Sequence, residues 1–254
     1  MFSTFPSNYL GEQKNFFLFA RNLINTMDMI NTTPTESNLS GLNQKDFQKD
    51  INNKKTDLFI LKNAQGMEVA VTNYGCAILS IMVPDKNGKY ANVVLGHDNI
   101  EHVINSPEPF LNTTIGRYGN RIKDAAFEIN GQTFSLDKND NGNCLHSGSA
   151  GFDKRIWDVE QPDDEHLILR LTDQDGEGGF PGTLDVTVRY SIEQNVFRVI
   201  HEATCDKATH VNLTQHPYFN LKPDDENIGN HELHLYSQRY LETTPDLIPT
   251  GNIL

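Results

Sequence analysis

The most regular hydrophobic pattern in the chain lies between residues 184 and 192. Apolar side chains occupy every second position there, and polar side chains fill the positions between them. Because successive side chains of a strand point to opposite faces, this alternation predicts a strand with one buried face. Residues 193–195 then predict a turn, and strands are expected on either side at 167–171 and 196–204.

Shorter apolar runs fill the preceding part of the chain. They predict strands at 58–61, 69–72, 78–83, 91–95, 125–129 and 132–136. The dipeptides Asn87-Gly88 and Asn130-Gly131 separate neighbouring runs. Asn-Gly supplies the positive φ angles that a tight hairpin turn requires. Many short strands joined by such turns predict an all-β protein, built as an antiparallel sandwich or barrel.

Residues 1–39 lack this alternation. They are rich in Asn, Thr and Ser, and they offer no obvious face to bury. We therefore expect a poorly ordered N-terminal extension over 1–39, whose composition still permits a short helix over 16–30. The β-sandwich domain is expected over 40–254.

Composition narrows the classes of partner. The chain has 254 residues, which suits a single all-β domain, and its formal net charge is −13. This charge and the lack of a Lys and Arg cluster argue against nucleic acid, and they are compatible with a small neutral ligand. No apolar run is long enough to span a membrane, and no secretory signal pattern stands out. We therefore expect a cytoplasmic protein without a membrane partner, and the oligomeric state stays open.

The sulfur and imidazole side chains do not form a metal-binding pattern. Cys76, Cys144 and Cys205 are scattered and lack C-x-x-C spacing, which predicts three free buried thiols. His231 and His234 have the spacing of a metal pair, but no third ligand or helical frame accompanies them. The sequence therefore predicts no metal site.

The run I-G-R-Y-G-N-R-I at 115–122 places two arginines and an asparagine between glycines. A guanidinium group offers several donors in a fixed geometry, which suits vicinal hydroxyls or a carboxylate. The alternative is a surface loop with solvated arginines, the commoner situation for charged side chains. Local sequence leaves both interpretations open.

Two further runs carry candidate chemistry. In the run 143–157, His146 ends a turn-rich stretch, a glycine-bearing loop follows, and Trp157 is the only tryptophan. We expect Trp157 to be a core residue on the next strand and His146 to be a site residue. The run G-F-P-G at 179–182 predicts a rigid turn, to which we assign no chemistry.

A last run, at 209–221, contains H-P-Y-F-N-L. Pro217 forces an extended backbone on the residue before it, so His216 can be fixed in orientation and aimed into a cleft. A lone histidine is more often structural, and we expect His201 and His210 to be structural.

Together these runs resemble the aldose 1-epimerase (galactose mutarotase) family. The resemblance covers about 40–254 and includes V-P-D-K-N-G, V-L-G, G-R-Y-G-N-R-I, L-H-S-G, G-F-P-G and H-P-Y-F-N-L in the family's order. It implies a large antiparallel β-sandwich of the galactose mutarotase-like supersandwich type, with a sugar cleft on one face. It also implies the interconversion of α and β anomers of free hexoses such as galactose and glucose, in hexose metabolism, without a metal or organic cofactor.

The resemblance also assigns roles to particular residues. His216 matches the family's general acid, which protonates the ring oxygen, and His146 matches its second active-site histidine, which helps hold the sugar near that oxygen. The positions that match substrate-binding or substrate-lining residues are Asn120, Arg121, Pro217 and Tyr218.

This chain also departs from the family pattern. Ser147 stands where relatives usually have the first glycine of L-H-G-G, and the family's glutamate base and a substrate-binding aspartate match no position here. We therefore expect a sandwich that is incomplete at its C-terminal end, with weakened mutarotation. The main alternative is a carbohydrate-binding module that lacks the general base. A relative acting on hexose 6-phosphates and a nonfunctional remnant are further alternatives.

Overall fold

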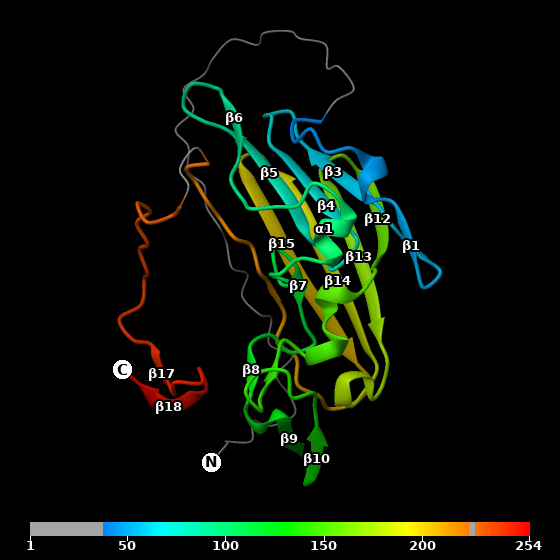
Figure 1. Cartoon of the computed structure of the whole chain (residues 1–254), viewed down its shortest axis with the longest axis vertical. Helices are drawn as coiled ribbons and strands as arrows, with labels where there is room; N and C mark the ends of the chain where they lie inside the picture. The colour runs from blue at the N-terminus through cyan, green and yellow to red at the C-terminus, as the bar shows by residue number, and fades with distance from the viewer. Residues whose placement is uncertain (1–37, 224–226) are drawn as a thin grey trace.

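The computed structural model describes residues 38–223 and 227–254. Two four-stranded antiparallel sheets form the body of the protein, and they pack face to face (Figure 1). The all-β antiparallel architecture predicted from the sequence is confirmed. The predicted extension at 1–39 falls outside the described residues except for its last two positions, and the helix considered at 16–30 lies wholly outside them.

The first sheet has the strand order β3-β4-β5-β6. Its strands are β3 (Leu58–Lys62), β4 (Glu68–Thr72), β5 (Ile78–Pro84) and β6 (Tyr90–Asn92). Every residue of β4 is buried because the strand is covered on both faces. Val69 and Val71 face the second sheet, and Ala70 packs in a separate cluster with Phe47, Ile100 and Val103.

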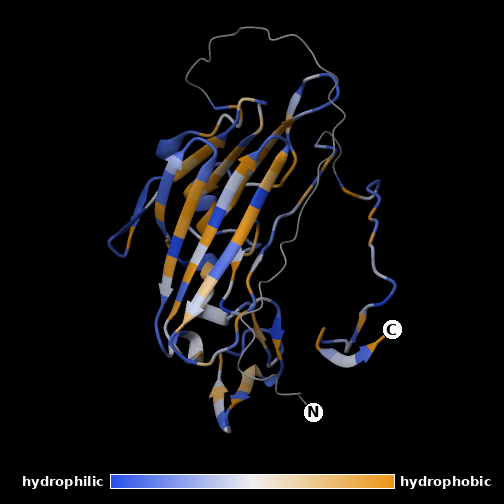
Figure 2. Ribbon diagram, turned by 180° about the vertical axis from the view of Figure 1, so that it is seen from behind, coloured by the Kyte–Doolittle hydropathy of each residue, from blue (hydrophilic) through white to orange (hydrophobic). Residues whose placement is uncertain are grey.

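The second sheet has the strand order β12-β13-β14-β15. Its strands are β12 (Asp158–Asp163), β13 (His166–Asp173), β14 (Leu184–Glu193) and β15 (Val196–Cys205). The alternation predicted at 184–192 is confirmed, because every apolar position of β14 is buried and the positions between them are more exposed. Figure 2 shows the same alternation as bands of colour along these long strands.

The main core lies between the two sheets. Leu167, Leu169, Val186 and Val188 of the second sheet pack in one cluster with the inward residues of β4 and β5. Trp157 belongs to this cluster and is 1% exposed, so its predicted core position is confirmed. Burial of these apolar faces is the main source of stability for the fold.

Shorter elements connect segments that are far apart in the sequence. They are β1 (Lys49–Ile51) with β2 (Lys54–Thr56), β7 (Thr114–Ile115) with β16 (Thr214–Gln215), β8 (Arg121–Ile122) with β11 (Cys144–Leu145), β9 (Ala126–Ile129) with β10 (Gln132–Ser135), β17 (Leu241–Thr243) with β18 (Pro249–Ile253), and the helix α1 (Ile100–Ile104). The pairs β7-β16 and β8-β11 bring the predicted site segments next to one another.

Some details differ from the sequence prediction. The strand expected at 91–95 ends at Asn92, although Val93 still donates a backbone hydrogen bond to Ile81. Cys76 and Cys144 are buried free thiols, but Cys205 is only half-buried because it ends the edge strand β15. The prediction of three buried thiols is therefore wrong for Cys205.

The lengths of the helices and the grouping of metal-ligating side chains address the predictions on membranes and metals. No helix within the described residues is long and apolar enough to cross a bilayer. The same residues hold no group of three or more His, Cys, Asp or Glu side chains arranged to bind a metal ion.

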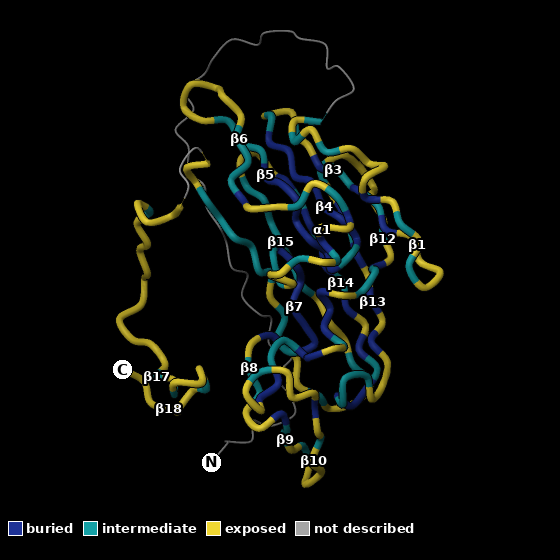
Figure 3. The backbone as a smooth tube through the Cα atoms, in the orientation of Figure 1, coloured by how far each residue is buried: buried dark blue, intermediate teal, exposed yellow. Residues whose placement is uncertain are grey.

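The segment 227–254 differs from the body in its burial. It runs outside the two sheets and carries the β17-β18 hairpin (Figure 1), and Figure 3 colours nearly all of it as exposed. Leu233 is 84% exposed and Tyr236 is 99% exposed. Apolar side chains of this segment therefore contribute little to the core described above.

Candidate active site

His216 is held by backbone hydrogen bonds on both sides. Its backbone N–H donates to the carbonyl oxygen of Thr113 over 3.0 Å, and its carbonyl oxygen accepts from the N–H of Asn112 over 3.0 Å. The next contact is at Tyr218, whose N–H donates to the side-chain oxygen of Asn112 over 2.8 Å. The H-P-Y run is therefore fixed against residues 112 and 113, next to the β7-β16 pair.

Gln215 anchors the same segment in the core. Its amide nitrogen donates to the carbonyl oxygen of Asn112 over 2.6 Å. Its amide oxygen accepts from the hydroxyl of Thr114 over 2.8 Å and lies 2.9 Å from the hydroxyl of Tyr190. Because Tyr190 belongs to the main core, this side chain ties the residue before His216 to the interior.

His146 is anchored on the Asn120 backbone through two hydrogen bonds, one to its ring and one from its own backbone N–H. The N–H of Asn120 donates to Nδ1 of His146 over 2.9 Å, and the N–H of His146 donates to the carbonyl oxygen of Asn120 over 3.1 Å. Since Nδ1 accepts a hydrogen bond, the neutral imidazole carries its proton on Nε2. The ring can then offer an Nε2–H donor to a ligand.

The neutral form of His146 is the favoured one. Burial, followed by the neighbouring His216, Arg121 and Lys154, lowers its pKa to about 4. At neutral pH His146 is therefore an uncharged hydrogen-bond donor rather than a cation.

The loop after His146 accommodates Ser147, which stands where the family pattern usually has a glycine. Ser147 has a φ of 66°, the left-handed region in which glycine is the least strained residue. Its side-chain oxygen accepts from the N–H of Tyr118 over 2.8 Å. The serine therefore adopts a glycine-like backbone conformation and adds a hydrogen bond to the G-R-Y-G-N-R-I run.

Two aromatic rings, those of Phe110 and Tyr218, lie against the two histidines. The His146 and His216 ring centroids are 5.7 Å apart, with the rings nearly perpendicular. Tyr218 stacks on His216 at 5.2 Å, and Phe110 contacts His146 edge-on at 4.6 Å. A surface of rings beside polar donors suits the mixed apolar and polar faces of a sugar.

Tyr218 also carries a carboxylate partner. Burial and a hydrogen bond with Glu108 raise the pKa of the Tyr218 phenol, so it stays protonated at neutral pH. The phenol group is thus available as a neutral hydrogen-bonding group beside His216.

Arg121 lies on the same side of the loop as Asn120. Its Nε donates to Asp140 over 2.6 Å, and its Nη1 lies 3.4 Å from the side-chain oxygen of Asn120. The side chains of Arg121 and Asp140 are 18% and 21% exposed, so the pair is partly accessible. The carboxylate fixes one edge of the guanidinium and leaves donors on its other edge.

The predicted site residues thus come together to different degrees. His146, His216 and Tyr218 share ring contacts, Asn120 joins them through Nδ1 of His146, and Arg121 contacts the Asn120 side chain. Pro217 is half-buried between His216 and Tyr218. Their roles stay predictions.

Sequence reasoning missed several supporting residues. Phe110 and Asp140 contact the candidate site residues but belong to no candidate motif, and Gln215 lies within the run 209–221 without an assigned role. Gln215 directly precedes His216, which is the one local signal that could have drawn attention to it.

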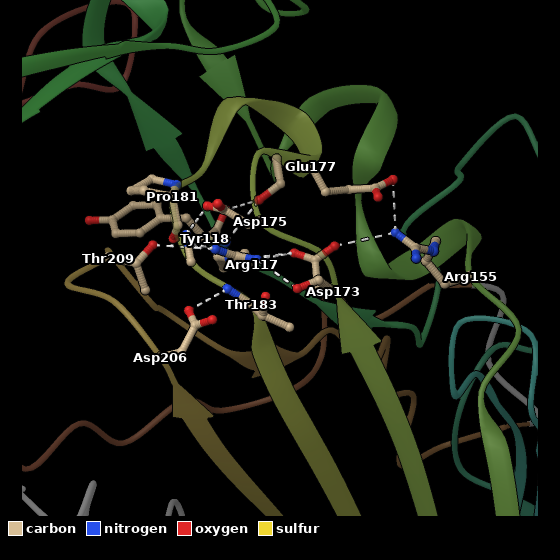
Figure 4. A network of polar contacts seen from close by, with 12 residues as sticks. Arg117, Tyr118, Arg155, Asp173, Asp175, Glu177, Pro181, Thr183, Asp206 and Thr209 are labelled. Carbon is tan, nitrogen blue, oxygen red and sulfur yellow. Dashed lines mark hydrogen bonds and ion pairs between the residues drawn. The ribbon is translucent and has the colours of Figure 1, made fainter.

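The two arginines of G-R-Y-G-N-R-I have different environments. Arg121 is half-buried beside the histidines, whereas Arg117 is 1% exposed and forms an ion pair with Asp173 (Figure 4). The alternative of a surface loop with solvated arginines is therefore wrong for Arg117, which is buried, whereas Arg121 keeps partial exposure beside Asp140. The G-F-P-G turn takes part too, since the Pro181 carbonyl accepts from Arg117.

Comparisons with known proteins agree with this fold and these segments. Residues 57–254 match the sequence profile of the aldose 1-epimerase family. Aldose 1-epimerase of Escherichia coli (strain K12) is 35% identical over 193 residues, which cover 76% of this chain and 56% of the relative. Galactose mutarotase of Homo sapiens is 36% identical over 188 residues, which cover 74% and 54%.

Solved structures show the same similarity. A homologue of aldose epimerase from C. elegans superposes with a TM-score of 0.74 at 28% identity, covering 78% of this chain and 61% of that one. Galactose 1-epimerase from Lactobacillus acidophilus NCFM gives a TM-score of 0.61 at 32% identity, covering 68% and 51%.

The chain belongs to the aldose 1-epimerase family. It has the galactose mutarotase-like β-sandwich fold, and the match spans about half the length of the curated relatives.

Proposed function

We propose that this protein is an aldose 1-epimerase that interconverts the α and β anomers of free hexoses such as galactose and glucose. The observation that carries the proposal is the pair of imidazoles of His146 and His216, whose ring centroids are 5.7 Å apart. His146 lies beside Asn120, which contacts Arg121, and these two side chains offer donors and acceptors for hydroxyl groups. The names of the relatives, aldose 1-epimerase and galactose mutarotase, support the same reaction.

Mutarotation needs an acid at the ring oxygen of the pyranose and a base at the anomeric hydroxyl. His216 is the proposed acid, because imidazole can donate a proton near neutral pH and its backbone is fixed on both sides. His146 is proposed to donate its Nε2–H to the sugar near the ring oxygen, which a neutral imidazole can do without carrying charge. These two donors would orient the ring oxygen for protonation.

The remaining contacts are proposed to select and hold the sugar. Asn120 and the free edge of Arg121 would bind hydroxyl groups, since Asp140 already occupies the other edge. Tyr218 and Pro217 would line the site next to His216. No metal or organic cofactor enters this scheme.

A second candidate function is a carbohydrate-binding module without efficient catalysis. Within residues 38–223 and 227–254, no carboxylate hydrogen-bonds the imidazole of His146 or of His216, so the described residues place no carboxylate base against these rings. Saturable galactose binding without rate enhancement would favour this second function.

The test is polarimetric mutarotation of freshly dissolved α-galactose with the purified chain, compared with buffer. His216→Ala should reduce the acceleration by about 10²–10⁴-fold, the usual contribution of a general acid. His166→Ala is the matched control, because His166 is an exposed histidine of β13 whose imidazole lies 2.8 Å from Asp163. Equal acceleration by His216→Ala and the unmodified chain would refute the proposed acid.

A further inference from the structure

Arg117 lies at the centre of a buried polar network (Figure 4). Its Nε and Nη2 lie 2.9 and 2.8 Å from Oδ2 of Asp173, and Nη2 also donates to the Asp173 carbonyl oxygen over 3.2 Å. Its Nη1 donates to the carbonyl oxygen of Pro181 over 2.9 Å. The guanidinium is therefore satisfied on all of its edges without water.

The network reaches several separate segments of the chain. Asp173 ends β13, Pro181 lies in the turn before β14, and Thr209 lies on the segment that leads to His216, with its hydroxyl 3.4 Å from Nη1 of Arg117. Arg155 adds a second guanidinium, 3.3 Å from Asp173 and 3.3 Å from Glu177. A single side chain thus ties the G-R-Y-G-N-R-I run to the segments on either side of the candidate site.

The backbone around Arg117 continues this connection toward both histidines. The N–H of Asn212 donates to the Arg117 carbonyl oxygen over 3.0 Å, and the N–H of Gly119 donates to the Asn212 carbonyl oxygen over 2.7 Å. Asn212 lies on the segment that ends at His216. Asn120, next to Gly119, holds Nδ1 of His146. The loop between Arg117 and Asn120 therefore contacts the supports of both imidazoles.

Burial of an ion pair is by itself weak evidence that the pair stabilises the fold. Charges lose their hydration when they are buried, and apolar side chains of similar volume often stabilise a core equally well. The pair has a consequence that apolar side chains would lack, because a planar guanidinium with fixed donors sets the relative positions of the groups it contacts.

We propose that the Arg117–Asp173 ion pair is the positioning element of this site, and that it sets the His146 imidazole against the His216 imidazole for binding the sugar. The inference rests on the proposed sugar-binding function. Arg117 touches neither imidazole, so it acts through the loop that carries Asn120.

The experiment compares Arg117→Lys and Asp173→Asn with the unmodified full chain. The histidine rings are followed by NMR during a pH titration, and galactose affinity is measured separately. Both variants should shift the loop that carries Asn120 and so let water reach the His146 ring. The pKa of His146 should then rise by at least about one unit from about 4. The Nδ1 signal should lose its hydrogen-bonded shift, and galactose affinity should fall by at least about tenfold.

Arg189→Lys is the matched control. Arg189 also forms an ion pair with a carboxylate, Glu202, over 2.7 Å, but this pair lies exposed on the second sheet. The same substitution there should leave both the His146 titration and the galactose affinity unchanged.

Two outcomes would overturn the inference. One is a folded Arg117→Lys or Asp173→Asn variant in which His146 titrates as in the unmodified chain. The other is loss of cooperative unfolding in both variants and also in Thr209→Val, which would make the network a requirement for folding rather than for the site. If the unmodified chain binds no galactose, the proposed function fails, and the His146 titration still decides whether the pair positions the ring.

Discussion

Strand β14 and the segment 227–254 both contain alternating apolar side chains, and these side chains end in opposite environments. The apolar positions of β14 are buried between two sheets, whereas Leu233 and Leu235 are 84% and 68% exposed. Leu233 and Leu235 lie outside the strands β17 and β18, so alternation alone specifies neither a strand nor its burial. Burial requires an opposing surface, which β4 and β5 provide for β14.

Side chains in the two regions should therefore contribute very differently to the free energy of unfolding. A side chain between the sheets loses its contact with water and gains packing partners on all sides. An exposed side chain on the segment 227–254 stays in contact with water and gains few packing partners. Substitutions in the two regions should therefore have very different costs, and three predictions test this contrast.

The largest effect is expected for Trp157→Ala. Trp157 is fully buried, its ring packs perpendicular to Phe152 at 5.7 Å, and its Nε1–H donates to the Phe152 carbonyl. Its removal should lower the free energy of unfolding by about 3–5 kcal/mol, whereas Leu235→Ala should change it by less than about 0.5 kcal/mol. Urea unfolding of the full chain measures both values.

The comparison fails if Trp157→Ala and Leu235→Ala lower the free energy of unfolding by similar amounts. In that case the segment 227–254 would pack against the body in solution, or Trp157 would leave a space that the core can fill by relaxation.

The second prediction concerns pH, because burial in the body changes the protonation of histidines. Burial lowers the pKa of both His146 and His201 to about 4. An unfolded histidine has a pKa of about 6.5, so between these values the unfolded chain binds more protons than the folded chain. Stability from these histidines is therefore complete above about pH 6.5 and falls as the pH decreases toward 4.

Buried carboxyl groups act in the opposite direction. Burial raises the pKa of Asp153 and Asp173, so the folded chain binds protons at these sites before the unfolded chain does. The histidine contribution is isolated by comparing the unmodified chain with a His146→Gln and His201→Gln double variant. The double variant should lose less stability between pH 7 and about pH 5, as measured by thermal unfolding. An equal loss in both proteins would contradict the prediction.

The contrast between regions also explains what the sequence could predict. Period-two alternation at 184–192 and the Asn-Gly turns predict the strands of the two sheets, because strand faces and hairpin turns are local properties. The order of motifs indicates the family and the candidate histidines. Neither signal states which arginine of G-R-Y-G-N-R-I is buried.

The unpredicted part of the site consists of contacts between distant segments. Arg117 and Asp173 are 56 residues apart, and Thr114 and Gln215 are 101 residues apart. No local pattern marks these partners, because their contacts arise only after the sheets have packed. The same reasoning applies to Asp140, which lies in a turn and became a partner of Arg121 only in the folded chain.

The smallest effect is expected for Tyr190→Phe, compared with Tyr236→Phe. The hydroxyl of Tyr190 lies 2.7 Å from the Cys76 carbonyl oxygen and 2.9 Å from Oε1 of Gln215, whereas Tyr236 is 99% exposed. Loss of the buried hydroxyl should lower the free energy of unfolding by about 0.5–1.5 kcal/mol, and the exposed substitution should leave it within about 0.5 kcal/mol. Because Gln215 precedes His216, only Tyr190→Phe should also shift the NMR signals of the His216 ring. A shift of those signals in Tyr236→Phe would mean that the exposed segment contacts the candidate site, and the contrast between the two regions would not hold there.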